Sequence, residues 1–395
     1  MAEPNYSLGQ VLSLEACTSC AICAEVCPAV KAATDGQLSG LYRLVELKKL
    51  LRTRAGFCAR LLGRRPYSAE ELARFGQTVF RCTLCGSCEQ ACPVGIGLKE
   101  LWLGLRQDLN RSKAHPDKVD LIWDNLASSH NVFGEDNAER SEWVEDMEEE
   151  PADGLVKDEA EVVYFTGCVA SFYPMAQEIP VALAEIMAAA GVEMTLLGQE
   201  EWCCGFPLLG AGLKDRAGEM IEHNIEAVRA KGAKEVVFTC PSCYQMWRER
   251  YPAVFEVHHA SQYLDRLITT GRLKLKELDL KVTYHDPCDL GRGSGNYEAP
   301  RRVIRAIPGV ELVELPRNRE DCQCCGGGGN LEMIDPGLAA GISKVKIDEV
   351  LATGAEAVIS SCQQCLRTMA THTRRNSVPL KVMDITQLLR RALSD

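Results

Sequence analysis

The sequence has no feature of a membrane-spanning or exported protein. No uninterrupted apolar run approaches the roughly 20 residues that a membrane-spanning helix needs. The N-terminus carries Glu3 and no apolar export signal. We therefore expect a chain of the reducing cytoplasm that does not cross a membrane by itself. Peripheral docking on the inner face of the membrane stays open.

An excess of positive charge and the usual nucleotide motifs are also missing. The net charge of −11 would make the backbone of a nucleic acid repel this chain. No Lys-Ser/Thr follows the glycine run 326–329, and the stretch 291–295 lacks the dinucleotide fingerprint. We expect no nucleic-acid partner and no flavin, nicotinamide or nucleotide site, so electrons have to arrive from another protein.

What the sequence has in abundance is cysteine, with 20 in 395 residues. In a reducing compartment so many thiols indicate metal ligands rather than disulfides. One five-cysteine pattern occurs twice, with 34 or 35 residues between its first cysteine and its cysteine pair, and 35 or 36 between the pair and its CxxC. The copies are Cys168, Cys203-Cys204-Gly205 and Cys240-Pro-Ser-Cys243, then Cys288, Cys324-Cys325-Gly326 and Cys362-Gln-Gln-Cys365. A duplicated five-thiolate set predicts two metal clusters.

The N-terminal third contains two copies of the bacterial ferredoxin run, in which three close thiolates bind one cluster and a fourth binds its neighbour. The runs are Cys17, Cys20, Cys23, Cys27-Pro28 and Cys82, Cys85, Cys88, Cys92-Pro93. They predict one 4Fe-4S cubane on Cys17, Cys20, Cys23 and Cys92, and another on Cys82, Cys85, Cys88 and Cys27. Two structural zinc sites are the alternative, but zinc sites seldom use this spacing.

The 54 residues between the two runs have a helical pattern, with Leu41, Leu44, Leu47 and Leu51 at helical spacing. A further helix is expected over 98–113. This arrangement resembles the α-helical ferredoxin domain of succinate dehydrogenase iron–sulfur subunits and of the C subunit of heterodisulfide reductases. The insert is basic, which we interpret as a solvated helix face or a docking patch for an acidic redox partner. Its basic residues are Arg43, Lys48, Lys49, Arg52, Arg54, Arg60, Arg64 and Arg65.

From about residue 160 the chain is built twice. Short β-rich runs at 161–167 and 281–287 end at the first cysteine of each pattern, and those at 235–239 and 357–360 lead into each CxxC. Helices are expected at 179–190 and 299–307, and each tail, 257–264 and 382–389, as a strand, an N-cap hydroxyl (Ser261 or Thr386) and a helix. This alternation predicts two Rossmann-like parallel-sheet units about a pseudo-twofold axis, with ligands at strand ends. Gly205 and Gly326 would let backbone approach the clusters closely.

A chain of this length is expected to form two or three domains. We predict an α-helical ferredoxin domain at 1–115, an acidic linker at 116–160, and two α/β domains at 161–275 and 276–395. Thirteen carboxylates and only two basic residues lie between Glu135 and Glu161. This stretch is interpreted as a solvated connector or a partner-binding strip.

The repeated five-cysteine patterns resemble the CCG domains of the heterodisulfide reductases, which occur in the B subunit and in the D subunit, where a ferredoxin domain is joined to two CCG domains. The resemblance implies one noncubane 4Fe-4S cluster on Cys168, Cys203, Cys204, Cys240 and Cys243, and another on Cys288, Cys324, Cys325, Cys362 and Cys365. It also implies that the ferredoxin cubanes pass electrons to these paired clusters, which reduce or form a disulfide. The alternative is an electron relay in a larger anaerobic complex whose chemistry lies on a partner protein.

We expect a heteromeric complex, because the chain has neither an electron source nor a final acceptor. Candidate partners are an electron-transfer flavoprotein, a flavin-bearing heterodisulfide reductase subunit and a membrane cytochrome b. His285 is the candidate proton donor for new thiolates, with a backbone-bonded strand cap as the alternative, and His258 and His259 are weaker candidates. Cys58 and Cys322 are left over, the first as a packing residue and the second as a spare ligand, a redox-active thiol or an inert neighbour.

Overall fold

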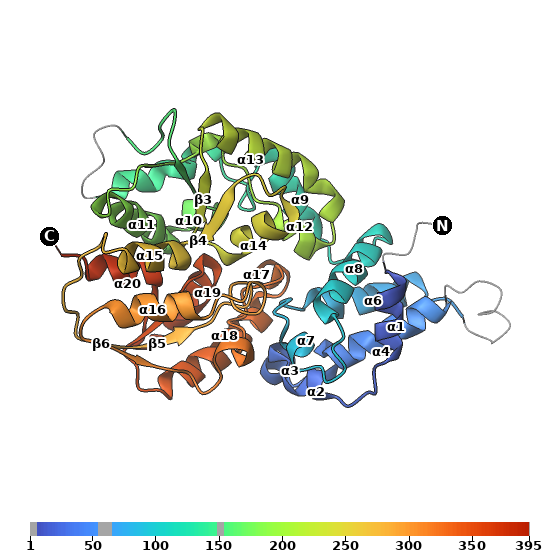
Figure 1. Cartoon of the computed structure of the whole chain (residues 1–395). Helices are drawn as coiled ribbons and strands as arrows, with labels where there is room; N and C mark the ends of the chain where they lie inside the picture. Colours follow the sequence, from blue (N-terminus) through green and yellow to red (C-terminus); the bar gives the residue numbers. More distant parts are fainter. Residues whose placement is uncertain (1–5, 54–64, 148–153, 395) are drawn as a thin grey trace. The chain divides into compact units, whose positions relative to one another are not determined.

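The computed structural model describes residues 6–53, 65–147 and 154–394. The chain divides into two compact units that do not follow the sequence order (Figure 1). The first unit contains Met1–Trp123, Pro207–Arg216 and Gly326–Val345, and the second contains Asp124–Phe206, Ala217–Cys325 and Lys346–Asp395. The segments that follow the two Cys-Cys-Gly motifs therefore belong to the unit that carries the ferredoxin runs. Cys58 lies outside the described residues, as do Arg54, Arg60 and Arg64.

The first unit has no strand in its described residues. Its helices from the N-terminal part are α1 (Leu8–Glu15), α2 (Ile22–Glu25), α3 (Pro28–Ala33), η1 (Gly36–Leu38), α4 (Gly40–Thr53), α6 (Ala69–Phe80), α7 (Ser87–Gln90) and α8 (Leu98–Arg111). The later segments add α12 (Phe206–Ala211), η5 (Lys214–Arg216), α17 (Leu331–Ile334) and most of α18 (Pro336–Leu351). Helix α9 (Lys118–Ser129) leads from the first unit to the second.

The two helices expected around the ferredoxin runs are present. Helix α4 covers the predicted leucine pattern, but it buries Leu44, Leu47 and Leu50 rather than Leu51. It also buries Arg43, so the interpretation of a wholly solvated basic face is wrong at this position. Helix α8 ends at Arg111, two residues earlier than expected, and buries its leucines at helical spacing. A capping box between Ser68 and Glu71 starts α6.

The second unit contains two parallel sheets of four strands each. The first has the order β2-β1-β3-β4 and the second the order β6-β5-β7-β8. Its strands are β1 (Val162–Phe165), β2 (Met194–Thr195), β3 (Glu235–Phe238), β4 (Glu256–His259), β5 (Leu280–His285), β6 (Val310–Val313), β7 (Ala357–Ser360) and β8 (Lys381–Asp384). This arrangement confirms the duplicated parallel α/β prediction, although β2 and β6 were not expected.

Helices connect the parallel strands in each half. Those of the first half are α10 (Cys168–Phe172), η3 (Pro174–Ala176), α11 (Glu178–Ala189), η4 (Gly198–Glu200), α13 (Gly218–Ala230), α14 (Pro241–Arg250) and α15 (Ala260–Thr269). The second half has α16 (Glu298–Ala306), η6 (Arg319–Asp321), the end of α18, α19 (Gln363–Arg375) and α20 (Ile385–Arg391). Helices α11 and α16 coincide with the helices expected after the first strand of each half.

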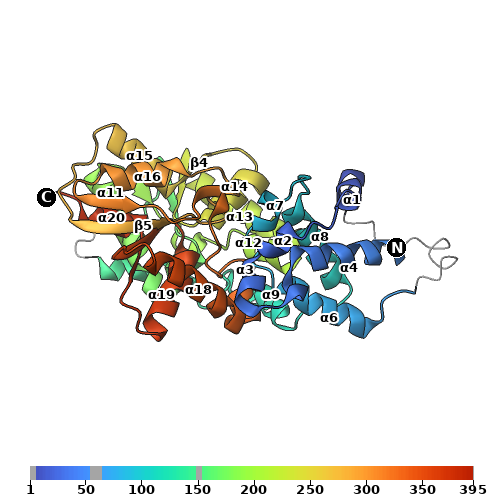
Figure 2. The ribbon, with the colours of Figure 1, turned by 90° about the horizontal axis from the view of Figure 1, so that it is seen from below.

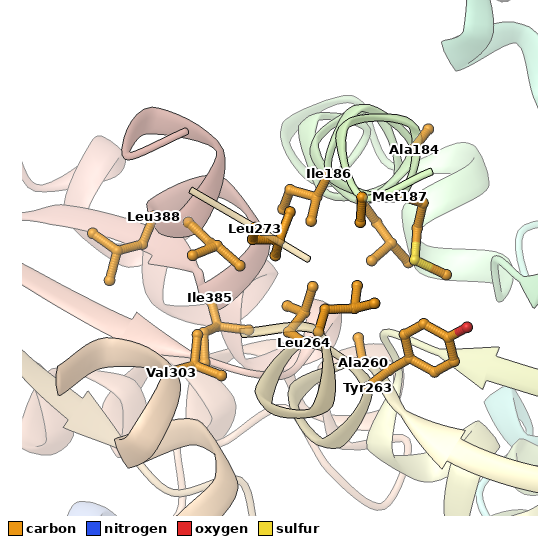
Figure 3. Close-up of a cluster of buried hydrophobic side chains, with 14 of the residues drawn as sticks. Ala184, Ile186, Met187, Ala260, Tyr263, Leu264, Leu273, Val303, Ile385 and Leu388 are labelled. Carbon is orange, nitrogen blue, oxygen red and sulfur yellow. The ribbon is translucent and has the colours of Figure 1, made fainter. Parts of the chain in front are cut away.

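One apolar core joins the two halves of the second unit. Helix α11 packs against α20, and α15 packs against α16, so each pair takes one helix from each half (Figure 2). Figure 3 shows Ile186 and Met187 of α11 facing the side chains of the other helices, among them Leu264 of α15 and Ile385 of α20. Each fully buried aliphatic side chain of this kind contributes about 1.5–3 kcal/mol. The two halves therefore share one apolar core.

The last helix of each half begins differently from the prediction. The N-cap residues are His259 for α15 and Asp384 for α20, and Ser261 and Thr386 lie inside the helices. His259 Nδ1 accepts a hydrogen bond from the Ser261 amide at 3.2 Å, and the Asp384 carboxylate accepts from the Thr386 amide at 3.0 Å. The expected serine and threonine caps are wrong because the preceding side chain already satisfies the first free amides.

The acidic stretch before β1 is not a fully solvated connector. Residues Asn137–Asp146 form the 3-10 helix η2, in which Arg140 and Trp143 are buried. Trp143 belongs to the core that joins the two sheets. These two side chains anchor the segment. Within the described ranges, no helix is both long and apolar enough to cross a membrane.

Candidate metal centres

The ferredoxin runs bring their eight cysteines together in two groups. A cavity is lined by Cys17, Cys20, Cys23 and Cys92, and a second is lined by Cys27, Cys82, Cys85 and Cys88. Each group takes three cysteines from one run and the fourth from the other run, which is the crossed arrangement that the sequence predicts. Local backbone conformation turns these thiols inward.

Equivalent positions of the two loops adopt the same unusual backbone conformation. Ser19 and Leu84, two residues after the first cysteine, have φ of 58° and 56°. Ala21 and Gly86, directly after the second cysteine, have φ of 67° and 76°. Left-handed conformations of non-glycine residues cost of order 1–3 kcal/mol and persist where the surroundings require them. Here they let three thiols of a short run point into one space.

Among the described residues, no carboxylate and no basic side chain lines the cavity of the first group. Burial raises the pKa of Cys23 to about 11, and the neighbouring Cys17, Cys20 and Cys92 contribute to this rise. Bound metal ions reverse this situation, because a coordinating thiol loses its proton outright. The donor set therefore fits a cationic iron–sulfur core.

The first CCG site collects five buried thiols. Cys168 starts α10 directly after β1, and Cys203 and Cys204 lie in the turn before α12. Cys240 is the N-cap of α14, and Cys243 lies in its first turn. Hydrogen bonds between neighbouring thiols shift their pKa values in opposite directions, with Cys204 lowered and Cys243 raised. All five expected ligands are thus brought together at the carboxyl ends of β1 and β3.

A buried ion pair, which the sequence did not reveal, supports the loop before Cys168. Arg140 Nη1 lies 2.8 Å from Glu201 Oε1, and both side chains are almost fully buried. Glu201 accepts hydrogen bonds from the amides of Thr166 and Gly167 at 2.7 and 2.8 Å. Arg140 Nη2 lies 3.9 Å from Cys168 Sγ. The pair fixes this loop and places a positive charge beside the thiols.

The second CCG site has a similar set of thiols. Cys324, Cys325, Cys362 and Cys365 are buried, whereas Cys288 is partly exposed. The Cys325 and Cys365 sulfurs are 3.3 Å apart. Cys362 is the N-cap of α19, and its sulfur accepts a hydrogen bond from the Cys365 amide at 3.4 Å. The five expected ligands come from the ends of β5 and β7 and from the turn before α17.

His285 ends β5 and lies inside the second site. One of its ring nitrogens lies within 4.8 Å of the Cys325 and Cys365 sulfurs, and Nδ1 is 3.5 Å from Cys322 Sγ. Burial alone would lower the pKa of His285, but the neighbouring Cys322 thiolate outweighs it and raises the pKa to about 9. The ring is therefore placed where it can hold a proton beside the thiols.

Cys322 is not a surface thiol. It is buried, and Lys346 Nζ lies 3.8 Å from its sulfur. Lys346 is itself fully buried and forms an ion pair with Glu349. The sequence did not identify Lys346, because a lysine in a helix of mixed charge carries no signal of burial.

The other two histidines named from the sequence have different neighbours. His258 Nε2 lies 3.0 Å from a carboxylate oxygen of Glu235, the first residue of β3. Burial lowers the pKa of His258. His259 is buried as the N-cap of α15, and burial lowers its pKa to about 3. His259 therefore has a structural role as a helix cap.

The two CCG sites are neighbours within the second unit. Gln363, inside the second CxxC, donates to Thr166 O at 2.7 Å and to Thr239 Oγ1 at 2.6 Å. Its Oε1 accepts from the Ala170 amide at 3.1 Å. Burial raises the pKa of Cys362 most, and the negative charge of Cys240 is the next largest cause of the rise. The CxxC of one half therefore lies close to the CxxC of the other.

The glycines of the two motifs have left-handed backbones. Gly205 has φ of 87° and Gly326 has φ of 102°. A Cβ at Gly326 would lie 2.6 Å from the Ala339 carbonyl oxygen of α18. Close backbone packing thus accounts for glycine at this position, and a role near a cluster stays a prediction.

The cysteine motifs lie in regions of the chain that match models of known protein families. Residues 162–248 and 282–370 each match the family model described as cysteine-rich domain (CCG), and residues 13–96 match that of the 4Fe-4S dicluster domain. The chain is 34% identical over 98% of its length to the D subunit of dihydromethanophenazine:CoB–CoM heterodisulfide reductase from Methanosarcina mazei, of which it covers 96%.

Two further relatives are more distant. The EtfAB:quinone oxidoreductase of Syntrophomonas wolfei is 28% identical over 98% of the chain, which covers 59% of that protein. The B subunit of fumarate reductase (CoM/CoB) from Methanothermobacter marburgensis is 26% identical over 97% of the chain, which covers 73% of it. The similarity thus extends over both units and all of the cysteine motifs.

Proposed function

We infer the function of this chain from the family to which it belongs, the CCG-domain iron–sulfur proteins that include the D subunit of heterodisulfide reductase. The chain is an iron–sulfur oxidoreductase subunit of the electron-transfer type. We propose that its ferredoxin cysteines hold two cubane clusters that pass electrons to two noncubane clusters, where a disulfide is reduced or formed. The observation that carries this proposal is a pair of thiol-rich sites that lie close together in one unit, with nine of their ten cysteines buried.

The proposed ligand sets are those expected from the ferredoxin runs and from the family resemblance. The cubanes would be held by Cys17, Cys20, Cys23 and Cys92, and by Cys27, Cys82, Cys85 and Cys88. The noncubane clusters would be held by Cys168, Cys203, Cys204, Cys240 and Cys243, and by Cys288, Cys324, Cys325, Cys362 and Cys365. When bound, the clusters supply one-electron transfer and iron atoms that can bind sulfur.

The two sites suit disulfide chemistry because a disulfide takes up two electrons and two protons to give two thiols. Neighbouring CxxC motifs allow one electron to arrive from each site. His285 holds a proton beside Cys322 and Cys325 and is the proposed donor to one new thiolate. Arg140 offsets negative charge at the first site, and Lys346 does so at the second.

We further propose that the two CCG halves are related by a pseudo-twofold axis and that the first unit is an α-helical ferredoxin domain. The packing of α11 on α20 and of α16 on α15 supports the axis. In each pair, the helix after the first strand of one half packs on the last helix of the other half. The helical segments α4, α6 and α8 around the ferredoxin cysteines support the second point.

A heteromeric complex follows from the missing electron source. The relatives named as subunits of heterodisulfide reductase and fumarate reductase, and as EtfAB:quinone oxidoreductase, support such a complex. The proposed electron donor is an electron-transfer flavoprotein, a flavin-bearing reductase subunit or a membrane cytochrome b. The names of the last two relatives also favour the second candidate function, an electron relay whose chemistry lies on a partner.

The test is iron and sulfide analysis with electron paramagnetic resonance on anaerobically purified protein, before and after addition of the CoB–CoM heterodisulfide. About 16 iron atoms per chain, the sum for four four-iron clusters, with a new signal that depends on the heterodisulfide supports the disulfide reductase. About 8 iron atoms, those of two four-iron cubanes, would refute the paired-site mechanism. A full iron content with no response to the heterodisulfide supports the relay.

A further inference from the structure

The segment that follows the second CCG motif lies directly on a ferredoxin ligand loop. Both belong to the first unit. A Cβ added at Gly328 would lie 2.5 Å from the Thr83 carbonyl oxygen, and one at Gly329 would collide with that of Cys82. No side chain fits at either position, so the two backbones are in contact. Along the chain, Gly329 is only four residues from Cys325, a proposed ligand of the second CCG site.

The same segment also covers a second ligand of the same cubane. Leu331, Leu338, Ala339 and Ile342 form a buried cluster with Cys27, Ala29 and Leu38. Cys27 and Cys82 are both proposed ligands of the Cys27/Cys82/Cys85/Cys88 cubane. The equivalent segment of the first half lies instead on α8, where Asn110 donates to Ala211 O at 3.1 Å and Gly212 contacts the Arg106 backbone. The second half is therefore the one attached to a ligand loop.

Arg106 of α8 holds this contact together. Its side chain is fully buried. Nη2 donates to Cys82 O at 2.6 Å and Nη1 donates to Gly329 O at 3.0 Å, so one guanidinium bridges the ligand loop and the glycine segment. It also donates to the carbonyls of Val79, Phe80 and Gly210. A planar five-donor group suits this bridge, which a lysine would not reproduce.

Two buried positive charges thus lie beside this cubane. The guanidinium of Arg106 is charged at neutral pH, because arginine does not lose its proton in proteins. Arg43 of α4 is buried as well, donates to Thr78 O at 3.2 Å and lines the cavity of the Cys27/Cys82/Cys85/Cys88 group. Among the described residues, no arginine or lysine lines the cavity of the Cys17/Cys20/Cys23/Cys92 group.

We propose that Arg106 is a positioning residue that makes the Cys27/Cys82/Cys85/Cys88 cubane the exit cluster of the ferredoxin unit. It holds Gly329 on Cys82, which directs electrons into the second CCG site, and together with Arg43 it keeps this cubane easier to reduce than the other. A fixed positive charge stabilises an added electron, and net charge and hydrogen bonds set cluster potentials. The inference rests on the proposed function, because it requires two cubanes and a second CCG cluster.

The solvent exposure of the cysteines agrees with electron entry at one cubane and exit at the other. Cys20, in the other cubane group, is exposed to solvent, whereas Cys27 and Cys85 are buried. A partner flavoprotein can therefore approach the Cys17/Cys20/Cys23/Cys92 group from outside. Two successive one-electron transfers along this route match the two electrons of one disulfide.

The first test is a potentiometric titration of the full-length protein, followed by electron paramagnetic resonance. The variant Cys20→Ser identifies the signal of the exposed cubane, because it changes one ligand of that cluster alone. We expect the changed signal to be that of the cubane with the lower potential. The opposite order would overturn the inference without any change at Arg106.

The second test compares Arg106→Gln, which removes the charge, with Arg106→Lys, which keeps it. We expect Arg106→Gln to lower the potential of the exit cubane alone by at least about 59 mV, which corresponds to tenfold in a one-electron equilibrium. Arg106→Lys should shift it less. Arg111→Gln, on the exposed side of α8 with an ion pair to Asp215, is the matched control and should shift neither cubane. Since Arg106→Gln can cost folding stability, Arg43→Gln provides an independent variant with the same expected shift.

The third test asks which CCG site is reduced first. In freeze-quench experiments, Cys204→Ser should leave reduction of the second site unchanged, whereas Cys325→Ser should slow reduction of the first site at least tenfold. Equal effects, or potentials that no arginine variant shifts, would overturn the inference. Fewer than two cubane signals would instead refute the proposed function, so the two failures are distinguishable.

Discussion

Replacing Arg140 by methionine tests the buried ion pair of the first CCG site. The substitution keeps an unbranched side chain but removes the guanidinium that lies 2.8 Å from Glu201. Glu201 would then remain a buried carboxylate, with only the amides of Thr166 and Gly167 to bind it. Burial already raises the pKa of Glu201 despite Arg140. Without the arginine this carboxylate has to be protonated or to remain uncompensated.

The expected loss follows from the burial of the pair. Breaking a buried ion pair by removing one partner costs about 3–5 kcal/mol. The exposed pair of Arg52 and Glu15 has the same distance of 2.8 Å, with 50% of the arginine and 45% of the glutamate side chain exposed. Exposed pairs contribute only about 0.2–1 kcal/mol. Arg52→Met is therefore the matched control and should cost about 1 kcal/mol or less.

The assay is anaerobic urea unfolding of the iron-loaded protein, followed by circular dichroism. The double variant Arg140→Met/Glu201→Gln should recover much of the loss, because a neutral amide oxygen can still accept from both backbone amides. Two results would refute the reasoning: an Arg140→Met loss no larger than that of Arg52→Met, or a double variant as unstable as the single one.

Three further predictions concern single positions. Burial lowers the pKa of His259 from 6.5 to about 3, so between these values the unfolded chain binds one proton more than the native chain; the free energy of unfolding should fall by about 1.4 kcal/mol per pH unit on acidification in that range. His259→Asn, which keeps an N-cap acceptor, should flatten this slope in urea unfolding between about pH 4 and 6, and an unchanged slope would contradict the assignment. Gly212→Ala places a Cβ 2.5 Å from the Arg106 carbonyl at φ +74°, whereas Gly232→Ala, at φ +65°, meets nothing within 4 Å. Gly232→Ala should cost about 1–2 kcal/mol of folding stability from backbone strain alone, and Gly212→Ala clearly more. Equal urea midpoints of the two variants would disprove this. Gln363→Leu leaves Thr166 O and the Ala170 amide without their partner and should cost about 1–3 kcal/mol for each buried group. Gln364 is adjacent and less buried, so Gln364→Leu should cost less than about 1 kcal/mol. A reversed order of the two variants in thermal unfolding would argue against the bridge that Gln363 forms between the halves.

The cysteine motifs and the strands that carry them were predictable from sequence because the relevant information is local. A CxxCxxC loop has few ways to turn three thiols inward, and short apolar runs directly before cysteines indicate buried parallel strands. The strands β1, β3, β5 and β7 lie where those runs occur. By contrast β2 is only two residues long, Met194–Thr195, and has too little pattern to be detected.

The charged side chains around the thiols were not predictable, because their burial depends on segments far apart in the chain. Arg140 is one basic residue in an acidic stretch, and its partner Glu201 is 61 residues away. Arg106 reaches Gly329, 223 residues further on. In sequence both look like ordinary surface arginines. Only tertiary packing decides that they are buried, and the same argument explains why Arg43 was assigned to a solvated face.

The two halves keep the same cysteines but support them with unrelated residues. In the first half, Glu201 binds the backbone before Cys168 and pairs with Arg140. In the second, Asp286 lies two residues before Cys288 and forms two hydrogen bonds with Arg301, at 2.7 and 2.9 Å. Both loops therefore rest on a buried arginine–carboxylate pair, although neither residue occupies an equivalent position. A thiol-rich site requires a fixed loop and a nearby positive charge. Any segment that packs beside the loop can supply the side chains that provide them. For this reason the repeat is faithful in its ligands and divergent in the side chains that hold them.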